Sequence, residues 1–130
     1  MNRWLILLLV LLIVGCEKEI DIEGKYSIGN YQLNISNVND KGFDFDVFGV
    51  SNTKGRGICD LEGKAIFKSD NTAIFKDNHS DLDVFGLDSC IYTFGIENDS
   101  IKFSVNTYRC ASLHCGSSAW FALKYAKEDD

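Results

Sequence analysis

The chain has 130 residues, of which 45% are hydrophobic, and it carries 13 basic side chains, 19 acidic side chains and no proline. This length accommodates one domain with a single core and leaves no room for a second. The formal charge of −6 repels nucleic-acid phosphates and anionic lipid headgroups, so we expect no nucleic-acid partner. The same charge attracts a basic protein partner, or it serves only to keep the surface soluble.

The N-terminal segment has the layout of a bacterial secretory signal. A positive start at Arg3 is followed by an apolar run from Trp4 to Val14, and the small residue Gly15 then precedes Cys16. As a helix, this run is too short to cross the hydrocarbon core of a bilayer, which is about 30 Å thick. We therefore expect export of the chain, with residues 1–15 acting as a signal.

Ile13-Val14-Gly15-Cys16 resembles the lipobox of bacterial lipoproteins. The resemblance implies lipidation of Cys16, removal of residues 1–15 and a short tether over residues 16–22, followed by a domain over residues 23–127. Several acyl chains hold a protein on a membrane permanently, whereas one chain does not. The alternatives are a membrane-anchored segment and an ordinary signal peptide that is cut elsewhere.

The residues after Cys16 bear on which membrane the protein occupies. They are Glu17, Lys18 and Glu19, without the Asp that favours inner-membrane retention in enterobacterial lipoproteins. We therefore expect an outer-membrane anchor, on the periplasmic face or at the cell surface. Cys-x-Lys-Glu also resembles surface-export signals of Bacteroidetes lipoproteins, with a plain charged tether as the alternative. Without residues 1–15 the chain keeps 12 basic and 19 acidic side chains, a formal charge of −7.

The body of the chain is predicted to be β-structure, because no segment has a sustained helical period. Apolar and polar residues alternate as expected of half-buried strands in four segments. These segments are 31–35, 43–47, 101–105 and 121–125. Four further strands, separated by Gly, Asn, Asp and Ser clusters, are predicted at about 22–28, 57–67, 72–77 and 89–96. We expect an all-β domain, a single antiparallel up-and-down barrel of about eight strands or a strongly curved sheet.

Two short segments predict hairpin turns between successive strands. Ser69-Asp70-Asn71-Thr72 separates two similar sequences, Ala65–Lys68 and Ala73–Lys76, and Glu97–Ser100 occupies an equivalent place between the next two predicted strands. The many inward Phe and Tyr residues predict a barrel interior filled by side chains.

The heptapeptide Asp44–Val50 recurs as Asp81–Leu87, with five of seven positions identical. We interpret each copy as a half-exposed strand that runs into a glycine bend. A second interpretation is a pair of acidic ladders that face a cation or the basic residues of a partner.

The remaining cysteines are Cys59, Cys90, Cys110 and Cys115. An even number in an exported domain predicts disulfides, and the meander places all four at one end of the barrel. We prefer the pairs Cys59–Cys110 and Cys90–Cys115, because they close long loops. Cys59–Cys90 with Cys110–Cys115 is the competing pattern. A metal site formed by these thiols and His114 is a further alternative, which an oxidising compartment disfavours.

Catalytic residues are hard to identify in this chain. It has two histidines, His79 and His114, and neither belongs to a nucleophile or zinc motif. Asp77, His79, Asp81 and Asp83 have the alternate spacing of a calcium loop, but the turn glycine and the final Glu of such a loop are missing. We expect a protein that is not an enzyme and that needs no metal or cofactor.

Several segments together resemble a family of small exported bacterial β-domains, some of which accompany lysozyme inhibitors. They are Gly57–Ala65, Ala73–Phe75, Cys90–Phe94, Cys115–Gly116 and Phe121–Tyr125. The resemblance covers residues 24–126 and implies a Cys90–Cys115 disulfide. Barrel-shaped lysozyme inhibitors insert a Ser-Gly-x-x-Tyr type of loop into the enzyme, and the nearest segment here, Gly116–Trp120, does not match it.

These features predict an anchored inhibitor or immunity protein that blocks a basic hydrolase or a secreted toxin. Its exposed loops would be residues 51–56, 77–83 and 107–120, since preorganised loops lose little entropy on docking. The candidate partner-binding residues are Asp77, His79, Asp81, Asp83, Ser117, Ser118 and Trp120. The alternatives are a lipocalin-like carrier of a small apolar ligand, suggested faintly by Gly24-Lys25-Tyr26, and a structural envelope lipoprotein.

Overall fold

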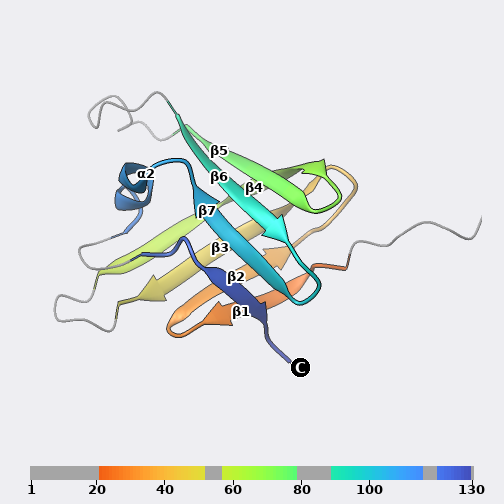
Figure 1. The fold of residues 1–130 in the computed structure, drawn as a ribbon, viewed down its shortest axis with the longest axis horizontal. Helices are drawn as coiled ribbons and strands as arrows, with labels where there is room; N and C mark the ends of the chain where they lie inside the picture. The colour runs from red at the N-terminus through yellow and green to blue at the C-terminus, as the bar shows by residue number, and fades with distance from the viewer. Residues whose placement is uncertain (1–20, 52–56, 79–88, 116–119, 130) are drawn as a thin grey trace, which may run out of the picture.

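A computed structural model describes residues 21–51, 57–78, 89–115 and 120–129. In it, eight antiparallel strands close into one barrel, and each strand pairs with the next along the chain (Figure 1). The strands are β1 Gly24–Ile28, β2 Tyr31–Ser36, β3 Gly42–Val50, β4 Ile58–Ser69, β5 Thr72–Asp77, β6 Cys90–Ile96, β7 Ser100–Val105 and β8 Lys124–Lys127. The predicted all-β, up-and-down barrel is confirmed. Pairing of Tyr26 in β1 with Lys127 in β8 closes the ring.

The barrel interior is filled by the apolar set of each alternating strand. Leu33, Phe45, Phe94 and Phe103 are each at most 3% exposed. The rings of Phe94 and Phe103 lie with their centroids 4.9 Å apart, and those of Phe45 and Phe94 lie 4.8 Å apart. Such aromatic contacts add to the stabilisation that apolar burial provides. The aromatic interior predicted from the sequence is confirmed.

The two predicted hairpin turns are also confirmed. Asp70 and Asn71 form the tip between β4 and β5, where Ser69 pairs with Thr72. At the tip between β6 and β7, the backbone N–H of Glu97 donates to the Ser100 carbonyl at 2.9 Å. Both turns are short because their polar side chains form local hydrogen bonds that stabilise the reversal of chain direction.

Two parts of the chain differ from the predicted strand pattern. Residues Tyr108–Ser112 form a short helix, α2, between β7 and β8. The last strand begins at Lys124 and not at Phe121, although Phe121 and Tyr125 are both fully buried. Alternation therefore identified the buried residues correctly but not the start of the ladder, because Phe121 enters the core before β8 pairs with its neighbours.

The two ends of the barrel have different connections. At one end, which we call the hairpin end, lie the β4–β5 and β6–β7 turns, together with Asp21–Glu23, where the described chain begins (Figure 1). At the other end lie α2 and the described residues that flank segments 52–56, 79–88 and 116–119. Among the described residues, no helix combines the length and apolar character needed to cross a bilayer.

Candidate functional site

Four cysteines join the strands to the α2 segment at the end of the barrel opposite the hairpin end. Two disulfides form there, Cys59–Cys115 with a sequence separation of 56 residues and Cys90–Cys110 with a separation of 20. We call this part of the molecule the stapled end. The prediction that all four cysteines gather at one end as disulfides is confirmed. Both predicted pairing patterns are wrong, including the Cys90–Cys115 bond that the family resemblance implied.

The path of the chain after β7 explains the observed pairing. The side-chain oxygen of Asn106 accepts a hydrogen bond from the backbone N–H of Ile91 at 3.2 Å, which holds the end of β7 beside the start of β6. The next turn of chain is α2, so Cys110 is the first cysteine to meet Cys90. Five residues later the chain has crossed to β4, where Cys115 forms an isolated β-bridge and a disulfide with Cys59.

A largely buried polar pair fixes the same crossing segment between β4 and β5. His114 Nε2 lies 2.6 Å from Asp77 Oδ2 at the end of β5, and the Asp60 backbone N–H donates to the His114 carbonyl at 2.9 Å. Here the β4–β5 ladder has already ended, since its last pair toward this end is Ile66 with Ile74. The crossing segment therefore covers the place where these two strands separate.

Tyr92 lies beneath this pair and links it to α2. Its hydroxyl donates to the Cys110 carbonyl at 3.0 Å, and its ring meets the His114 ring edge to face with centroids 6.2 Å apart. Burial, and to a lesser extent the nearby Asp77 carboxylate, raise the pKa of Tyr92 well above its usual range. The phenol therefore stays neutral and serves as a hydrogen-bond donor inside the stapled end.

The predicted partner-binding residues have different positions in the structure. Asp77 was expected on an exposed loop, but it is only 7% exposed and faces His114, so that expectation is wrong. Trp120 is 42% exposed, and its indole N–H donates to the Ala122 carbonyl at 3.1 Å. The other five, His79, Asp81, Asp83, Ser117 and Ser118, lie outside the described residues. Cys16 lies outside them as well.

The alternative metal site at the cysteines does not form. All four of these cysteines are oxidised in disulfides, so no thiolate remains to bind a metal beside His114. Among the residues that the structure describes, no group of three or more His, Cys, Asp or Glu side chains is arranged to hold a metal ion.

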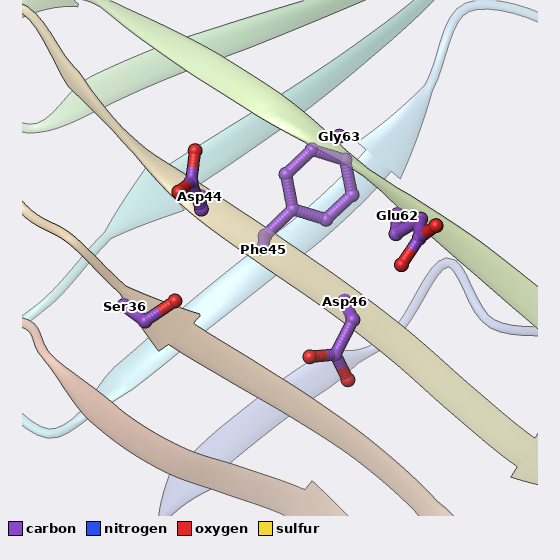
Figure 2. A pocket seen from close by; sticks show the side chains of 6 residues that line it. All are labelled: Ser36, Asp44, Phe45, Asp46, Glu62 and Gly63. Carbon is purple, nitrogen blue, oxygen red and sulfur yellow. The ribbon is translucent and has the colours of Figure 1, made fainter.

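A carboxylate-rich surface covers the outside of β3 and the first half of β4, and the sequence pattern predicts only the β3 part of it. We call it the acidic face and define it by its outward residues Asp44, Asp46, Phe48, Val50, Ile58, Asp60 and Glu62. Figure 2 shows Asp44 and Asp46 on β3 beside Glu62 on β4. Asp46 stands directly opposite Glu62, and Phe48 stands opposite Asp60. The first Asp-x-Asp copy is thus a half-exposed strand, as predicted, but the predicted glycine bend is wrong, because β3 stays paired with β4 through Gly49 to Val50. The second copy lies outside the described residues.

Local hydrogen bonds hold two carboxylates of the acidic face, those of Asp46 and Asp44, in place. The Asn34 side-chain amide donates to Asp46 at 2.8 Å, and the Asn37 amide donates to Asp44 at 2.8 Å. Lys64 Nζ lies 3.9 Å from Asp44 Oδ1 at the boundary of the face. Like charges directly opposite each other on neighbouring strands are destabilising, so the Asp46–Glu62 pair is a feature that folding alone does not favour.

Two hollows and two apolar side chains give this surface its shape. One hollow of about 470 Å³ is lined by Ser36, Asp44, Phe45, Asp46, Glu62 and Gly63 (Figure 2). Another, of about 310 Å³, is lined by Asp60, Leu61, Glu62, Phe75, Asp77 and His114, and so connects the acidic face to the stapled end. Phe48 is 49% exposed and Ile58 is 51% exposed. Apolar side chains beside fixed carboxylates suit a protein surface rich in Lys and Arg.

The sequence held a signal for this face that alternation alone did not reveal. Asp60-Leu61-Glu62 repeats the Asp-x-Asp spacing of β3, but only the strand register shows that the two acidic pairs stand side by side.

Comparisons with known proteins find no match to this chain among family models, curated proteins or solved structures.

Proposed function

We propose that the chain is a lipid-anchored envelope protein that binds and blocks a basic, envelope-attacking enzyme, either a lysozyme-type hydrolase or a secreted toxin. The observation that carries this proposal is the acidic face. Its four carboxylates, Asp44, Asp46, Asp60 and Glu62, share one side of the barrel with the exposed Phe48. Charge complementarity of this kind speeds the encounter with a basic partner and disfavours acidic ones.

The arrangement of the two ends supports the same function. The described chain begins at Asp21, at the hairpin end, so a tether from Cys16 would attach there (Figure 1). The stapled end and the adjoining part of the acidic face then lie away from the membrane. Two disulfides and the Asp77–His114 pair cross-link the described part of that end. A rigid surface loses little conformational entropy on docking, which favours tight blocking of an enzyme.

The carrier alternative receives less support from the barrel interior. A carrier needs internal space for its ligand. Here Leu33, Tyr92, Phe94 and Tyr125 are all 0% exposed, and aromatic rings meet across the interior. We therefore assign the partner to the outside of the barrel.

The experiment uses the soluble domain from residue 17 onward, because every strand of the barrel lies within residues 24–127. The domain, with its disulfides formed, is immobilised and exposed to lysozyme-type muramidases and to secreted proteins of envelope-competing bacteria. Captured proteins are identified by mass spectrometry and tested for loss of activity. We expect capture of one basic hydrolase or toxin together with its inhibition. Capture of envelope components or lipids alone would contradict the proposal.

Charge reversal locates the binding surface. We expect Asp46→Lys combined with Glu62→Lys to weaken binding of the captured enzyme by at least about tenfold, since each rim charge contributes to a charge-complementary interface. Asp70→Lys combined with Asp99→Lys makes the same change in net charge in the two turns at the hairpin end and should leave affinity within about twofold. Equal losses in both variants would show that net charge, and not the acidic face, determines binding.

A further inference from the structure

A second surface of the barrel carries the opposite charge. The outward positions at the end of β4 and along β5, β6 and β7 include three lysines, Lys68, Lys76 and Lys102, all exposed. Among the described residues, no Asp or Glu occupies an outward position of β5, β6 or β7, or of β4 beyond Glu62. In a chain with a formal charge of −6, this surface is a local exception to the overall charge, because its strands carry lysines and its nearest carboxylates, such as that of Glu97 near Lys102, lie in the flanking turns.

The centre of this second surface is apolar. Ile66 on β4 is 52% exposed and stands opposite Ile74 on β5, which in turn stands opposite Thr93 on β6. Ile91 stands opposite Lys76. An apolar centre within a charged rim is the usual anatomy of a protein–protein interface. We call this surface the lysine face and define it by the residues Ile66, Lys68, Thr72, Ile74, Lys76, Ile91, Thr93 and Lys102.

The acidic face and the lysine face are complementary in their composition. Each has exposed apolar residues, Phe48 and Ile58 on one and Ile66 on the other, and the residues that define each face carry charges of a single sign. Lys64, opposite Asp44, lies between the two faces. They meet along β4, where Glu62 belongs to the acidic face and Lys68 to the lysine face. One copy therefore presents both halves of a matching pair on adjoining sides of the barrel.

We propose that the lysine face docks on the acidic face of a second copy of this chain. Pairing of two identical faces would bring like charges together, which costs free energy. Contacts between unlike faces avoid this cost, and in the head-to-tail form of this contact every copy in an assembly keeps one face available for the next. Such heterologous contacts produce open chains, or rings where the rotation between copies closes.

This association would compete with the proposed enzyme target, because both use the acidic face. The biological role of the self-association therefore rests on the proposed function. The measurement of self-association does not, because it needs no enzyme. Self-association is tested on the isolated domain, whereas enzyme blocking is tested with the captured enzyme. A negative result for self-association therefore does not contradict enzyme blocking, and a negative result for enzyme blocking does not contradict self-association.

The first test is analytical ultracentrifugation of the disulfide-bonded domain from residue 17. We expect the weight-average mass to rise above that of the monomer with increasing protein concentration at about 20 mM salt. It should return to the monomer value at about 500 mM salt, where exposed charges are screened over a few ångströms. A monomer at every concentration at low salt would overturn the proposal.

Paired charge reversals supply the decisive control. Lys68→Glu with Lys76→Glu gives a protein with two acidic faces. Asp46→Lys, Asp60→Lys and Glu62→Lys together give one with two basic faces, because only Asp44 then remains acidic on the acidic face. Each variant alone should remain monomeric, and an equimolar mixture of the two should associate again. Arg109→Glu, on the exposed side of α2, changes a charge outside the residues that define the two faces and should associate like the parent. Circular dichroism first establishes that each variant is folded. A mixture of the folded variants that stays monomeric would overturn the proposal.

The same variants separate a second copy from a membrane as the occupant of the lysine face. Sedimentation with phosphatidylcholine vesicles containing phosphatidylglycerol measures lipid binding directly. We expect no binding that depends on Lys68 and Lys76. A domain that stays monomeric and binds these vesicles only while both lysines are present would show that the lysine face meets lipid, which would overturn the proposal.

Discussion

The hairpin end and the stapled end of this barrel are held together in different ways. At the hairpin end, turns such as Asp70–Asn71 reverse the chain within a few residues and use local hydrogen bonds, including one from Ser69 Oγ to Asn71 Oδ1 at 2.9 Å. At the stapled end, residues far apart in sequence are joined, as in the Cys59–Cys115 bond across 56 residues. Short turns are sufficient to connect neighbouring strands of the barrel. The α2 segment at the stapled end is held in place by disulfides between residues far apart in the sequence.

Removal of a disulfide should have the largest effect on this difference. We expect Cys59→Ala with Cys115→Ala to lower the free energy of unfolding by about 4 kcal/mol, and Cys90→Ala with Cys110→Ala to lower it by about 3 kcal/mol, because the first pair closes the longer loop. Urea denaturation measures both losses. Hydrogen exchange should accelerate at the stapled end and stay slow in the β4–β5 hairpin. Equal acceleration at both ends would contradict the distinction.

Loss of the buried polar pair is the next largest change. Asp77→Ala leaves His114 without the carboxylate that lies 2.6 Å away, and breaking such a buried pair should cost about 3 kcal/mol of stability. Asp70→Ala removes an exposed carboxylate from a turn at the hairpin end and is the matched control. Its thermal unfolding should resemble that of the parent, and equal losses in the two variants would contradict the assigned role of Asp77.

The sequence predicted the hairpin end far better than the stapled end. The turns around Asp70 and Asp99 were identified because turn chemistry is local, and strand alternation identified most of the buried residues. The disulfide pairing was predicted wrongly because it depends on α2, a five-residue helix too short to show a helical period. Asp77 was placed on a loop because the sequence gives no sign of a His114 that lies 37 residues away.

The acidic face was only half predictable for a similar reason. Asp44 and Asp46 are conspicuous in the sequence, and so is their alternation with buried Phe45. Their position beside Glu62 depends on the register between β3 and β4, which no local pattern specifies. Surface charge patterns that cross strands become visible only when the register is known.

A smaller effect is expected from a side chain in a hairpin turn. Asn71→Ala removes the oxygen that accepts hydrogen bonds from Ser69 and from Thr72 Oγ1 at 3.3 Å. We expect a loss of about 1 kcal/mol, typical of neutral hydrogen bonds, measured by urea denaturation with Asn98→Ala in the other turn as a comparison. A loss as large as that of a disulfide would show that the hairpin end also depends on one dominant link.

The smallest expected effect has the opposite sign. Glu62→Gln removes the repulsion between Asp46 and the carboxylate directly opposite, so we expect the domain to gain about 0.5 kcal/mol of stability. Affinity for a basic enzyme should fall in the same variant. Thermal unfolding and binding measured on one preparation test both signs. A variant that is less stable than the parent would contradict the view that this pair opposes folding.

A hydrogen-exchange footprint of the complex with the captured enzyme tests directly whether the acidic face is the binding surface. We expect slower exchange in β3, in the first half of β4 and in the described part of the stapled end, with no change in the turns at Asp70–Asn71 and Asn98–Asp99. Protection confined to those turns would place the partner at the hairpin end and contradict the assignment of the acidic face.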